Sequence, residues 1–194
     1  MTLSHKTVAL FGGSFNPIHI GHIQTAEYLQ SVFHYDYFIF IPVSIPVHKD
    51  SSAIIDGRHR LQMCRLAAAV IPNAIVSDME IKRGGSSYTV DTVRELLRYG
   101  DNETVIDVVI GDDLLPGLPK WKEIDALCSL AHFVCLTRES VRPQLPYPIT
   151  YIDNPIIEVS SSQIRDRIKN GESIDGLVPS SVAGYIAENN LYAK

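Results

Sequence analysis

Short, almost continuous apolar runs alternate along the chain with segments whose apolar residues recur at helical spacing. The apolar runs are bounded by turn residues, a pattern typical of buried strands. They predict strands over residues 7–11, 37–43, 74–79, 105–110, 132–137 and 149–152. The segments with helical spacing predict helices over residues 19–33, 58–70, 89–99, 121–131, 160–171 and 180–189. Residues 44–56 are predicted to form a polar loop.

This alternation defines the expected fold class. Strands that are apolar throughout, separated by helices, indicate a parallel sheet covered on both faces. We therefore predict an α/β, Rossmann-like doubly wound parallel sheet with C-terminal helices. Residues 1–194 are expected to form one domain, helical from about residue 160 onward. In such sheets ligands bind beyond the carboxyl ends of the strands, so the loops at those ends are the first place to look for chemistry.

Composition narrows the class of protein. The 194 residues include 17 Lys and Arg against 22 Asp and Glu, a net charge of −5 that argues against a general nucleic-acid binder. No stretch approaches the ~20 apolar residues of a membrane span, and the start of the chain lacks the pattern of a signal peptide. Three scattered cysteines without a CxxC pair favour a reducing compartment. We expect a cytoplasmic protein without nucleic-acid or membrane partners.

The charged residues are unevenly distributed along the chain. Residues 71–159 carry all of the negative excess, with 8 Lys and Arg against 14 Asp and Glu. Residues 1–70 have a net charge of +1 and six of the seven histidines, and residues 160–194 are neutral. The two ends of the chain are therefore its less acidic parts, and the first of them carries most of the histidines.

The first candidate motif is GGSFNPIHIGH, residues 12–22, directly after the first predicted strand. Gly12 and Gly13 permit a tight turn and close approach of a ligand, and Ser14 can hydrogen-bond a phosphate oxygen. His19 and His22 are three residues apart at the start of a helix, so they share one face, and a helix N-terminus favours anions. Alternatives are an ordinary turn with two surface histidines, or a metal-binding histidine pair. The loop is neither GxGxxG nor a P-loop.

The second candidate motif is VSSSQIR, residues 159–165, at the start of a predicted helix. The hydroxyls of Ser161 and Ser162 and the helix N–H groups form a second potential anion site. Arg165 lies one turn further on, where its guanidinium can contact phosphate with two N–H groups. Taken alone, the segment would be interpreted as a serine-rich cap followed by a solvated arginine.

Together these two strings resemble the motifs of the HxGH nucleotidylyltransferases and, within them, of the bacterial nicotinate-nucleotide adenylyltransferases. VSSSQIR is similar to the family's ISSTxIR motif, with Val for Ile and Ser for Thr. The resemblance implies that His19, His22 and Arg165 contact ATP phosphates and stabilise the transition state. The family commonly has Asp where this chain has Asn16, a position that we expect to shape the loop.

Three further segments carry the resemblance through the middle of the chain: PVSIPVHK (42–49), SSYTVDTVREL (86–96) and VIGDDLLPGLPKW (109–121). They are similar to the family's PxxxPPHK, SYTxDTL and IIGxDxxxxLxxW segments, with Val47 in place of a Pro. The resemblance implies substrate contacts by Lys49, Tyr88, Thr89 and Trp121, with Thr89 near a nicotinate carboxylate and Trp121 stacked on the pyridine ring. Without the two flanking motifs, these residues would be interpreted as loop charges, a helix cap and core packing. The implied ATP-binding residues are Gly12, Gly13, Ser14, Phe15, Gly111, Asp113, Ser160, Ser161 and Ser162.

The function implied by the resemblance is adenylyl transfer from ATP to nicotinate mononucleotide, with Mg²⁺ carried by ATP and no dedicated metal site in the protein. Alternatives are a nicotinamide mononucleotide or phosphopantetheine adenylyltransferase, a nucleotide-binding regulator without catalysis, and a metal-dependent hydrolase using the two histidines. Whether the chain forms a homo-oligomer is left open; residues 138–148, with three prolines and two arginines, are a candidate contact surface. Arg58, Arg60 and Arg65, with His59, are expected to form the solvated face of a helix, and Cys64 to be a core thiol.

Overall fold

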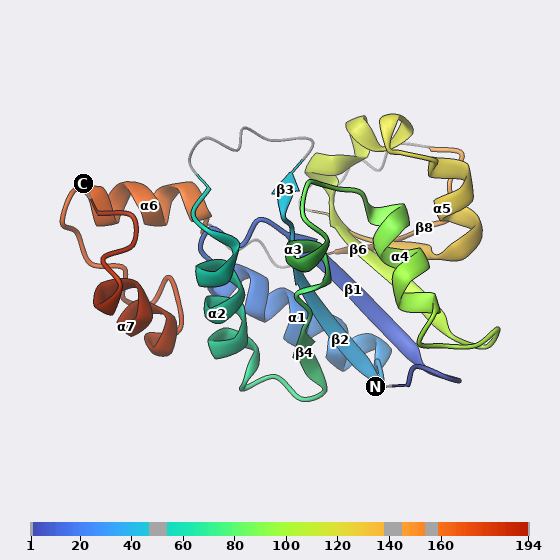
Figure 1. Ribbon diagram of the computed structural model, residues 1–194, viewed down its shortest axis with the longest axis horizontal. Helices are drawn as coiled ribbons and strands as arrows, with labels where there is room; N and C mark the ends of the chain where they lie inside the picture. Colours follow the sequence, from blue (N-terminus) through green and yellow to red (C-terminus); the bar gives the residue numbers. More distant parts are fainter. Residues whose placement is uncertain (1, 47–53, 138–144, 154–158, 194) are drawn as a thin grey trace.

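A six-stranded parallel sheet forms the centre of the molecule (Figure 1). The computed structural model describes residues 2–46, 54–137, 145–153 and 159–193. The strands follow the order β4-β2-β1-β6-β7-β8, and each neighbouring pair is parallel. Their bounds are β1 Thr7–Gly13, β2 Tyr37–Pro42, β4 Ala74–Val76, β6 Val105–Gly111, β7 His132–Thr137 and β8 Ile149–Asp153.

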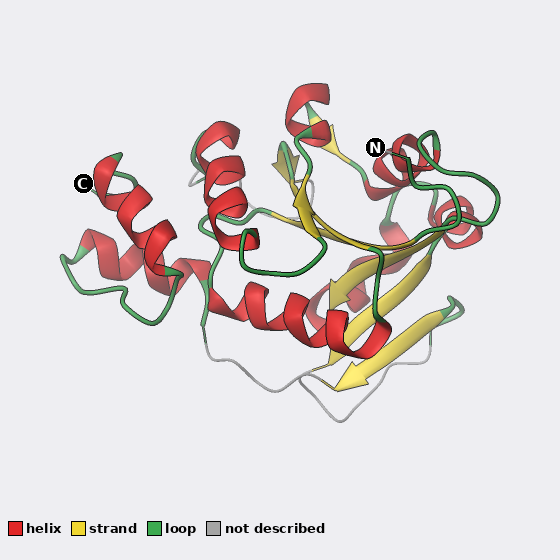
Figure 2. Ribbon diagram, turned by 90° about the horizontal axis from the view of Figure 1, so that it is seen from below, coloured by secondary structure: helices red, strands yellow, loops and turns green. Residues whose placement is uncertain are grey.

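Helices cover both faces of this sheet (Figure 2). One apolar core lies between the sheet and α1, α2, α6 and α7, and the other between the sheet and α4, η1 and α5. The expected doubly wound α/β fold is therefore confirmed. The helix bounds are α1 Ile20–Phe33, α2 Gly57–Ala68, α3 Met79–Arg83, α4 Thr89–Leu97, the 3₁₀ helix η1 Asp112–Lys120, α5 Ile124–Leu130, α6 Ser161–Lys169 and α7 Ser180–Glu188.

The two cores explain why the strands are apolar without alternation. Successive side chains of a strand point to opposite faces, and in β1 Val8 and Leu10 enter one core while Ala9 enters the other. Both faces exclude water, so each position is filled by an apolar residue. Burial of Cys64, which is 0% exposed, confirms the expectation of a core thiol.

The direction of winding reverses beside β1. From β1 the chain proceeds outward through β2 to β4, then crosses to β6 on the other side of β1 and proceeds through β7 to β8. At such a reversal the loops after the two central strands diverge and leave a crevice at their carboxyl ends. Here those loops follow Gly13 of β1 and Gly111 of β6, the positions at which two of the sequence motifs lie.

Several short elements differ from the sequence prediction. Residues 44–56 are not wholly a loop, because Ile45–Pro46 forms β3 and pairs with Ser86–Ser87, which forms β5. The predicted strand 74–79 ends at Val76 because α3 begins at Met79, and η1 precedes α5, whose first residue is Ile124. These elements have two to nine residues, too few for a periodic pattern to be recognised.

The ends of the C-terminal helices follow the capping pattern. Ser160 is the N-cap of α6, where its hydroxyl accepts a hydrogen bond from the backbone N–H of Gln163 at 3.2 Å. Pro179 directly precedes α7. Within the described ranges, no helix has both the length and the apolar composition needed to cross a bilayer.

We expect Phe38→Ala to lower the free energy of unfolding by about 3–5 kcal/mol, because its ring is 0% exposed and the substitution leaves a cavity in the core. Urea denaturation measures the change. Val70→Ala is the control: Val70 is 72% exposed, so its truncation should change the free energy by less than about 0.5 kcal/mol. Equal effects at the two positions would contradict the assignment of Phe38 to the core.

Candidate active site

Two adjoining cavities lie at the reversal point of the sheet. The first has a volume of about 510 Å³ and the second about 150 Å³. Gly12 and Gly13 at the end of β1 and Ser14 directly after it line both cavities, as do residues at the end of β6. The loop predicted to bind phosphate therefore forms the wall between two spaces.

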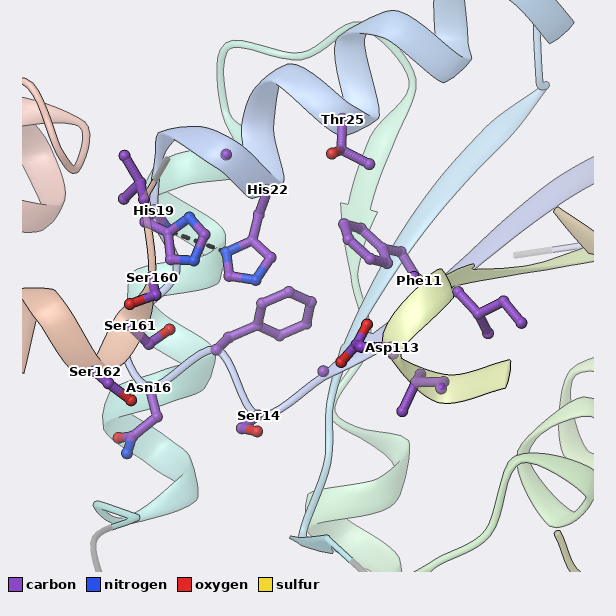
Figure 3. Close-up of a pocket in the computed structure, with 18 of the residues that line it drawn as sticks. Phe11, Ser14, Asn16, His19, His22, Thr25, Asp113, Ser160, Ser161 and Ser162 are labelled. Carbon is purple, nitrogen blue, oxygen red and sulfur yellow. Dashed lines mark hydrogen bonds between the residues drawn. The ribbon is translucent and has the colours of Figure 1, made fainter. Parts of the chain in front are cut away.

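Figure 3 shows the first cavity, with the histidines of α1, the serines of α6 and Asp113 of η1 arranged around the loop after β1. The cavity brings together residues that are far apart in the sequence. Its lining includes the following residues predicted to contact ATP: Gly12, Gly13, Ser14, Phe15, His19, His22, Gly111, Asp113, Ser160, Ser161, Ser162 and Arg165.

His19 and His22 lie side by side at the start of α1. Their ring centroids are 3.7 Å apart, and the backbone N–H of His19 donates to Nδ1 of His22 at 3.2 Å (Figure 3). This bond requires a lone pair on Nδ1, so the neutral ring of His22 carries its proton on Nε2. His22 can therefore donate a hydrogen bond from the opposite edge of its ring.

Aromatic packing holds His22 in place. The Phe15 ring lies edge-on to the His22 ring with 5.0 Å between centroids, and Phe15 is only 2% exposed. A Cβ atom at Gly13 would approach the Phe15 ring to 2.9 Å, too close for any larger residue. Glycine at position 13 therefore makes room for the ring that supports the histidine.

The start of α6 is fastened to the loop after β1. Arg165 donates from Nη1 to the carbonyl of Asn16 at 2.8 Å and from Nη2 to the Ser162 hydroxyl at 3.1 Å. The Ser161 hydroxyl donates to the carbonyl of Pro17 at 2.8 Å. These bonds use two of the five N–H donors of the guanidinium and hold its charge at the edge of the cavity.

The side chain of Asn16 also holds the loop after β1 in place. It is 3% exposed, and its Oδ1 accepts a hydrogen bond from the hydroxyl of Tyr192 at 3.0 Å and from the backbone N–H of Ile55 at 3.4 Å. The amide side chain thus shapes the loop, as expected, by linking it to two distant segments. The hydrogen bond from Tyr192 to Asn16 could not be predicted from the sequence, because no motif connects these two positions, which are 176 residues apart.

The second cavity brings together Tyr88, Thr89 and Trp121, three of the residues predicted to contact the second substrate. Thr89 is the first residue of α4, so the N-terminus of this helix reaches the cavity wall. Trp121 packs edge-on against Phe133 with centroids 6.0 Å apart. Lys49, the fourth predicted residue, lies outside the described residues, as does the 138–144 part of the candidate contact surface.

Two charged residues of the second cavity were missed by sequence analysis. Lys122 lies 4.9 Å from the centre of the Tyr88 ring and pairs with Asp91 at 2.8 Å, so it supports both the ring and the start of α4. Glu80 is the other, and its position on α3 could not be anticipated because α3 was not predicted.

Glu80 is a buried carboxyl group at the cavity wall. It is 4% exposed, and its Oε1 accepts a hydrogen bond from the Thr92 hydroxyl at 2.6 Å. Burial raises the pKa of Glu80, although hydrogen bonds from Ser87 and Thr92 oppose the shift. The nearest guanidinium, that of Arg83, is 3.9 Å away and bonds instead to Glu95 at 2.8 Å.

Arg60 contradicts the expectation of a solvated helix face. Arg58 and Arg65 are exposed, but Arg60 is 2% exposed and donates to three backbone carbonyls. His59 is half-buried and bonds through Nδ1 to the Tyr185 hydroxyl of α7 at 2.9 Å. The prediction was wrong because the loop after β1 and helix α7 cover this face of α2, which helical spacing alone cannot reveal.

Comparison with known proteins now gives the class. The chain belongs to the cytidylyltransferase-like family, whose model matches residues 10–167. Within it, the chain is similar to proteins named as nicotinate-nucleotide adenylyltransferases. It is 40% identical to the probable enzyme of Bacillus licheniformis, over 96% of this chain and 98% of that relative. It is 37% identical to the enzyme of Bacillus subtilis, over 96% of this chain and 98% of that relative.

Solved structures share the fold. The Plasmodium falciparum nicotinic acid mononucleotide adenylyltransferase complexed with NaAD has a TM-score of 0.76 to this chain at 18% identity. The match covers 97% of this chain and 98% of that one. A putative nicotinate-nucleotide adenylyltransferase from Vibrio parahaemolyticus has a TM-score of 0.67 at 19% identity, with 96% and 95% coverage.

The raised pKa of Glu80 predicts a pH-dependent stability difference. The folded-state pKa lies above the unfolded value, so stability is lost as the pH rises from about 4.5 through the raised pKa and the buried group ionises. Glu80→Gln cannot ionise and keeps an acceptor for Thr92. Across this pH range we expect the free energy of unfolding of Glu80→Gln to rise relative to that of the wild type. Urea denaturation at each pH measures the difference.

Asp36→Asn is a control of opposite sign. Hydrogen bonds from Thr7 and Lys6 lower the pKa of Asp36, so its contribution is present near neutral pH and is lost on acidification. The variant should therefore lose stability relative to the wild type as the pH rises. Parallel pH profiles for Glu80→Gln and the wild type would contradict the environment described for Glu80.

Proposed function

We propose that the chain is a nicotinate-nucleotide adenylyltransferase, an enzyme of NAD biosynthesis. It joins ATP and nicotinate mononucleotide to give nicotinate adenine dinucleotide and pyrophosphate. The two adjoining cavities carry this proposal, because transfer between two nucleotides needs two binding spaces that meet at the reacting phosphorus. The wall that they share includes Gly12, Gly13 and Ser14, where β1 ends and the following loop begins.

The chemistry requires no covalent intermediate with the protein. A phosphate oxygen of nicotinate mononucleotide forms a bond to the α-phosphorus of ATP. The bond between the α-phosphorus and the oxygen that bridges it to the β-phosphorus breaks. The electron pair of that bond leaves with pyrophosphate. The attacking oxygen is already anionic, so no general base is needed. Catalysis then consists of positioning the substrates and stabilising charge on the phosphates.

In this proposal the first cavity holds ATP. His22 donates from Nε2 to a phosphate oxygen, and His19 contacts the phosphates beside it. Arg165, held by Asn16 and Ser162, contributes its positive charge. The start of α6, with its three serines, adds hydroxyl and N–H donors, and Asp113 lies across the cavity, on the side assigned to adenosine.

The second cavity holds the nicotinate mononucleotide. Its lining is mostly apolar and includes Trp121, whose indole suits stacking on a pyridine ring. The N-terminus of α4 at Thr89 favours a negative group, and Lys122 adds a positive charge nearby. A carboxylate on the ring is better matched to these groups than a neutral carboxamide.

Mg²⁺ enters this scheme as part of the ATP complex. It neutralises phosphate charge and is held by phosphate oxygens and water, as is common for substrates of this kind. In the part of the chain that the structure describes, no three His, Cys, Asp or Glu side chains converge to hold a metal ion. This favours the transferase over a hydrolase with a metal bound to His19 and His22.

The proposal also includes the partners of the enzyme and its cellular compartment. Its partners are ATP and nicotinate mononucleotide, with no nucleic acid or membrane, and it works in the cytoplasm. The three cysteines are free thiols, two of them buried, which suits a reducing compartment.

Pyrophosphate release in the presence of ATP, Mg²⁺ and one acceptor at a time tests the function. We expect kcat/KM with nicotinate mononucleotide to exceed that with nicotinamide mononucleotide by about tenfold or more, because the donors around Thr89 and Lys122 match a carboxylate. Phosphopantetheine and water should give no release above background. Release with water alone would indicate a hydrolase, and preference for another acceptor would overturn the substrate.

The proposed role of His22 gives a separate prediction. His22→Ala should lower kcat by about 10²–10³-fold, because it removes a positioned donor to the transferring phosphate. The fold should persist, since the side chain lines the cavity. His132→Ala is the matched control: it lies at the start of β7, at the opposite end of the sheet, and should leave kcat unchanged. A folded His22→Ala protein with near-normal turnover would refute the role.

A further inference from the structure

Arg60 lies directly behind the loop that separates the two cavities. It projects from α2, lines neither cavity, and donates to the carbonyls of Ser14 at 2.9 Å, Ile55 at 3.1 Å and Ser44 at 3.3 Å. One guanidinium thus joins the loop after β1, the segment after β2 and the residue that leads into α2. Its planar fork of donors suits three carbonyls better than an ammonium group would.

Stability alone does not explain a charge at this position. Within the described residues no carboxylate lies within 4.0 Å of Arg60; burial lowers the pKa of the guanidinium, and the more distant carboxylates of Asp56 and Glu80 oppose this shift. The guanidinium stays charged at neutral pH. Burying a charge without a direct ion pair is costly, and apolar residues fill such positions more favourably. The charge is therefore expected to serve the loop in front of it.

The bond to Ser14 fixes the orientation of one peptide group. The Ser14–Phe15 peptide is trans and planar, so its N–H points opposite to its carbonyl. Arg60 holds that carbonyl on the side of α2, and the Phe15 N–H is therefore directed away from Arg60. Ser14 and Phe15 both line the first cavity. No described residue accepts a hydrogen bond from the Phe15 N–H.

Resting on the proposed adenylyl transfer, we propose that Arg60 is a positioning residue. It holds the Ser14 carbonyl away from the first cavity and so presents the Phe15 N–H to the transferring phosphate. A carbonyl oxygen facing the phosphate would repel it, whereas an N–H group stabilises the charge that develops there. Arg60 adds a positive charge behind the same peptide without contacting substrate.

Two variants separate this role from ordinary packing. Arg60→Met keeps much of the side-chain length but removes every donor, and Arg60→Lys keeps the charge without the planar fork. We expect kcat to fall by about 10²-fold in Arg60→Met, with a smaller loss in Arg60→Lys. The KM for nicotinate mononucleotide should change by less than about threefold, because Arg60 does not line the second cavity.

Arg65→Met is the matched control on the same helix. Arg65 is exposed and lies 3.9 Å from Asp78, so its loss should leave kcat unchanged. Thermal unfolding of all three variants provides the folded fraction used to correct the rates. Wild-type activity in the acceptor assay is measured first, so failure of the proposed function is distinguished from failure of the role of Arg60.

An amide resonance tests the geometry directly. In protein labelled with ¹⁵N-phenylalanine, the Phe15 amide proton should shift downfield when a non-hydrolysable ATP analogue is added with Mg²⁺. The shift should be reduced in Arg60→Lys. The proposal is overturned if the wild-type resonance does not move, if the folded variants keep kcat within about twofold of wild type, or if neither variant folds.

Discussion

The site depends on where the backbone carbonyls of one short loop point. A loop that approaches phosphate closely must keep its oxygen atoms away from the anion, because two negative groups repel strongly where water is excluded. In this chain the carbonyls of Ser14, Asn16 and Pro17 are each bonded by a side chain: Arg60, Arg165 and Ser161 respectively. The same bonds attach α2 and α6 to the loop after β1, so the packing of these helices also sets the orientation of the loop carbonyls.

The elements that carry a periodic pattern could be predicted from the amino-acid sequence. Apolar runs identified the strands of the sheet, and the motifs after β1 and before α6 identified the residues that line the first cavity. Burial of Arg60 could not be predicted, because its partners include Ser14, 46 residues earlier in the chain. Burial of Glu80 could not be predicted, because the short helix α3 that carries it has no recognisable pattern. A charged residue on a helix is usually solvated. Arg60 is buried because a loop packs over α2, and Glu80 is buried on the short helix α3.

The charge pattern is also clearer in three dimensions. The ends of the chain do supply His19, His22 and Arg165, as their weaker acidity suggested. The acidic middle segment nevertheless reaches both cavities, through Asp113 in the first and Glu80 in the second. Burial disfavours the ionised form of Glu80 and so moderates its repulsion of an anionic ligand. Net charge therefore predicts little about a site whose charges are so unevenly solvated.

The hydrogen bond between Tyr192 and Asn16 has a consequence for biosynthesis. The loop after β1 leaves the ribosome well before the hydroxyl that fixes the Asn16 amide, because Tyr192 comes 176 residues later in the chain. Helix α6, which holds two of the loop carbonyls, is also made late. Strands β1 and β2 precede α6 and Tyr192 in the chain, so the backbone of the loop is made before the groups that bond its carbonyls and its amide. The order of synthesis therefore leaves the final arrangement of this loop to the last part of folding.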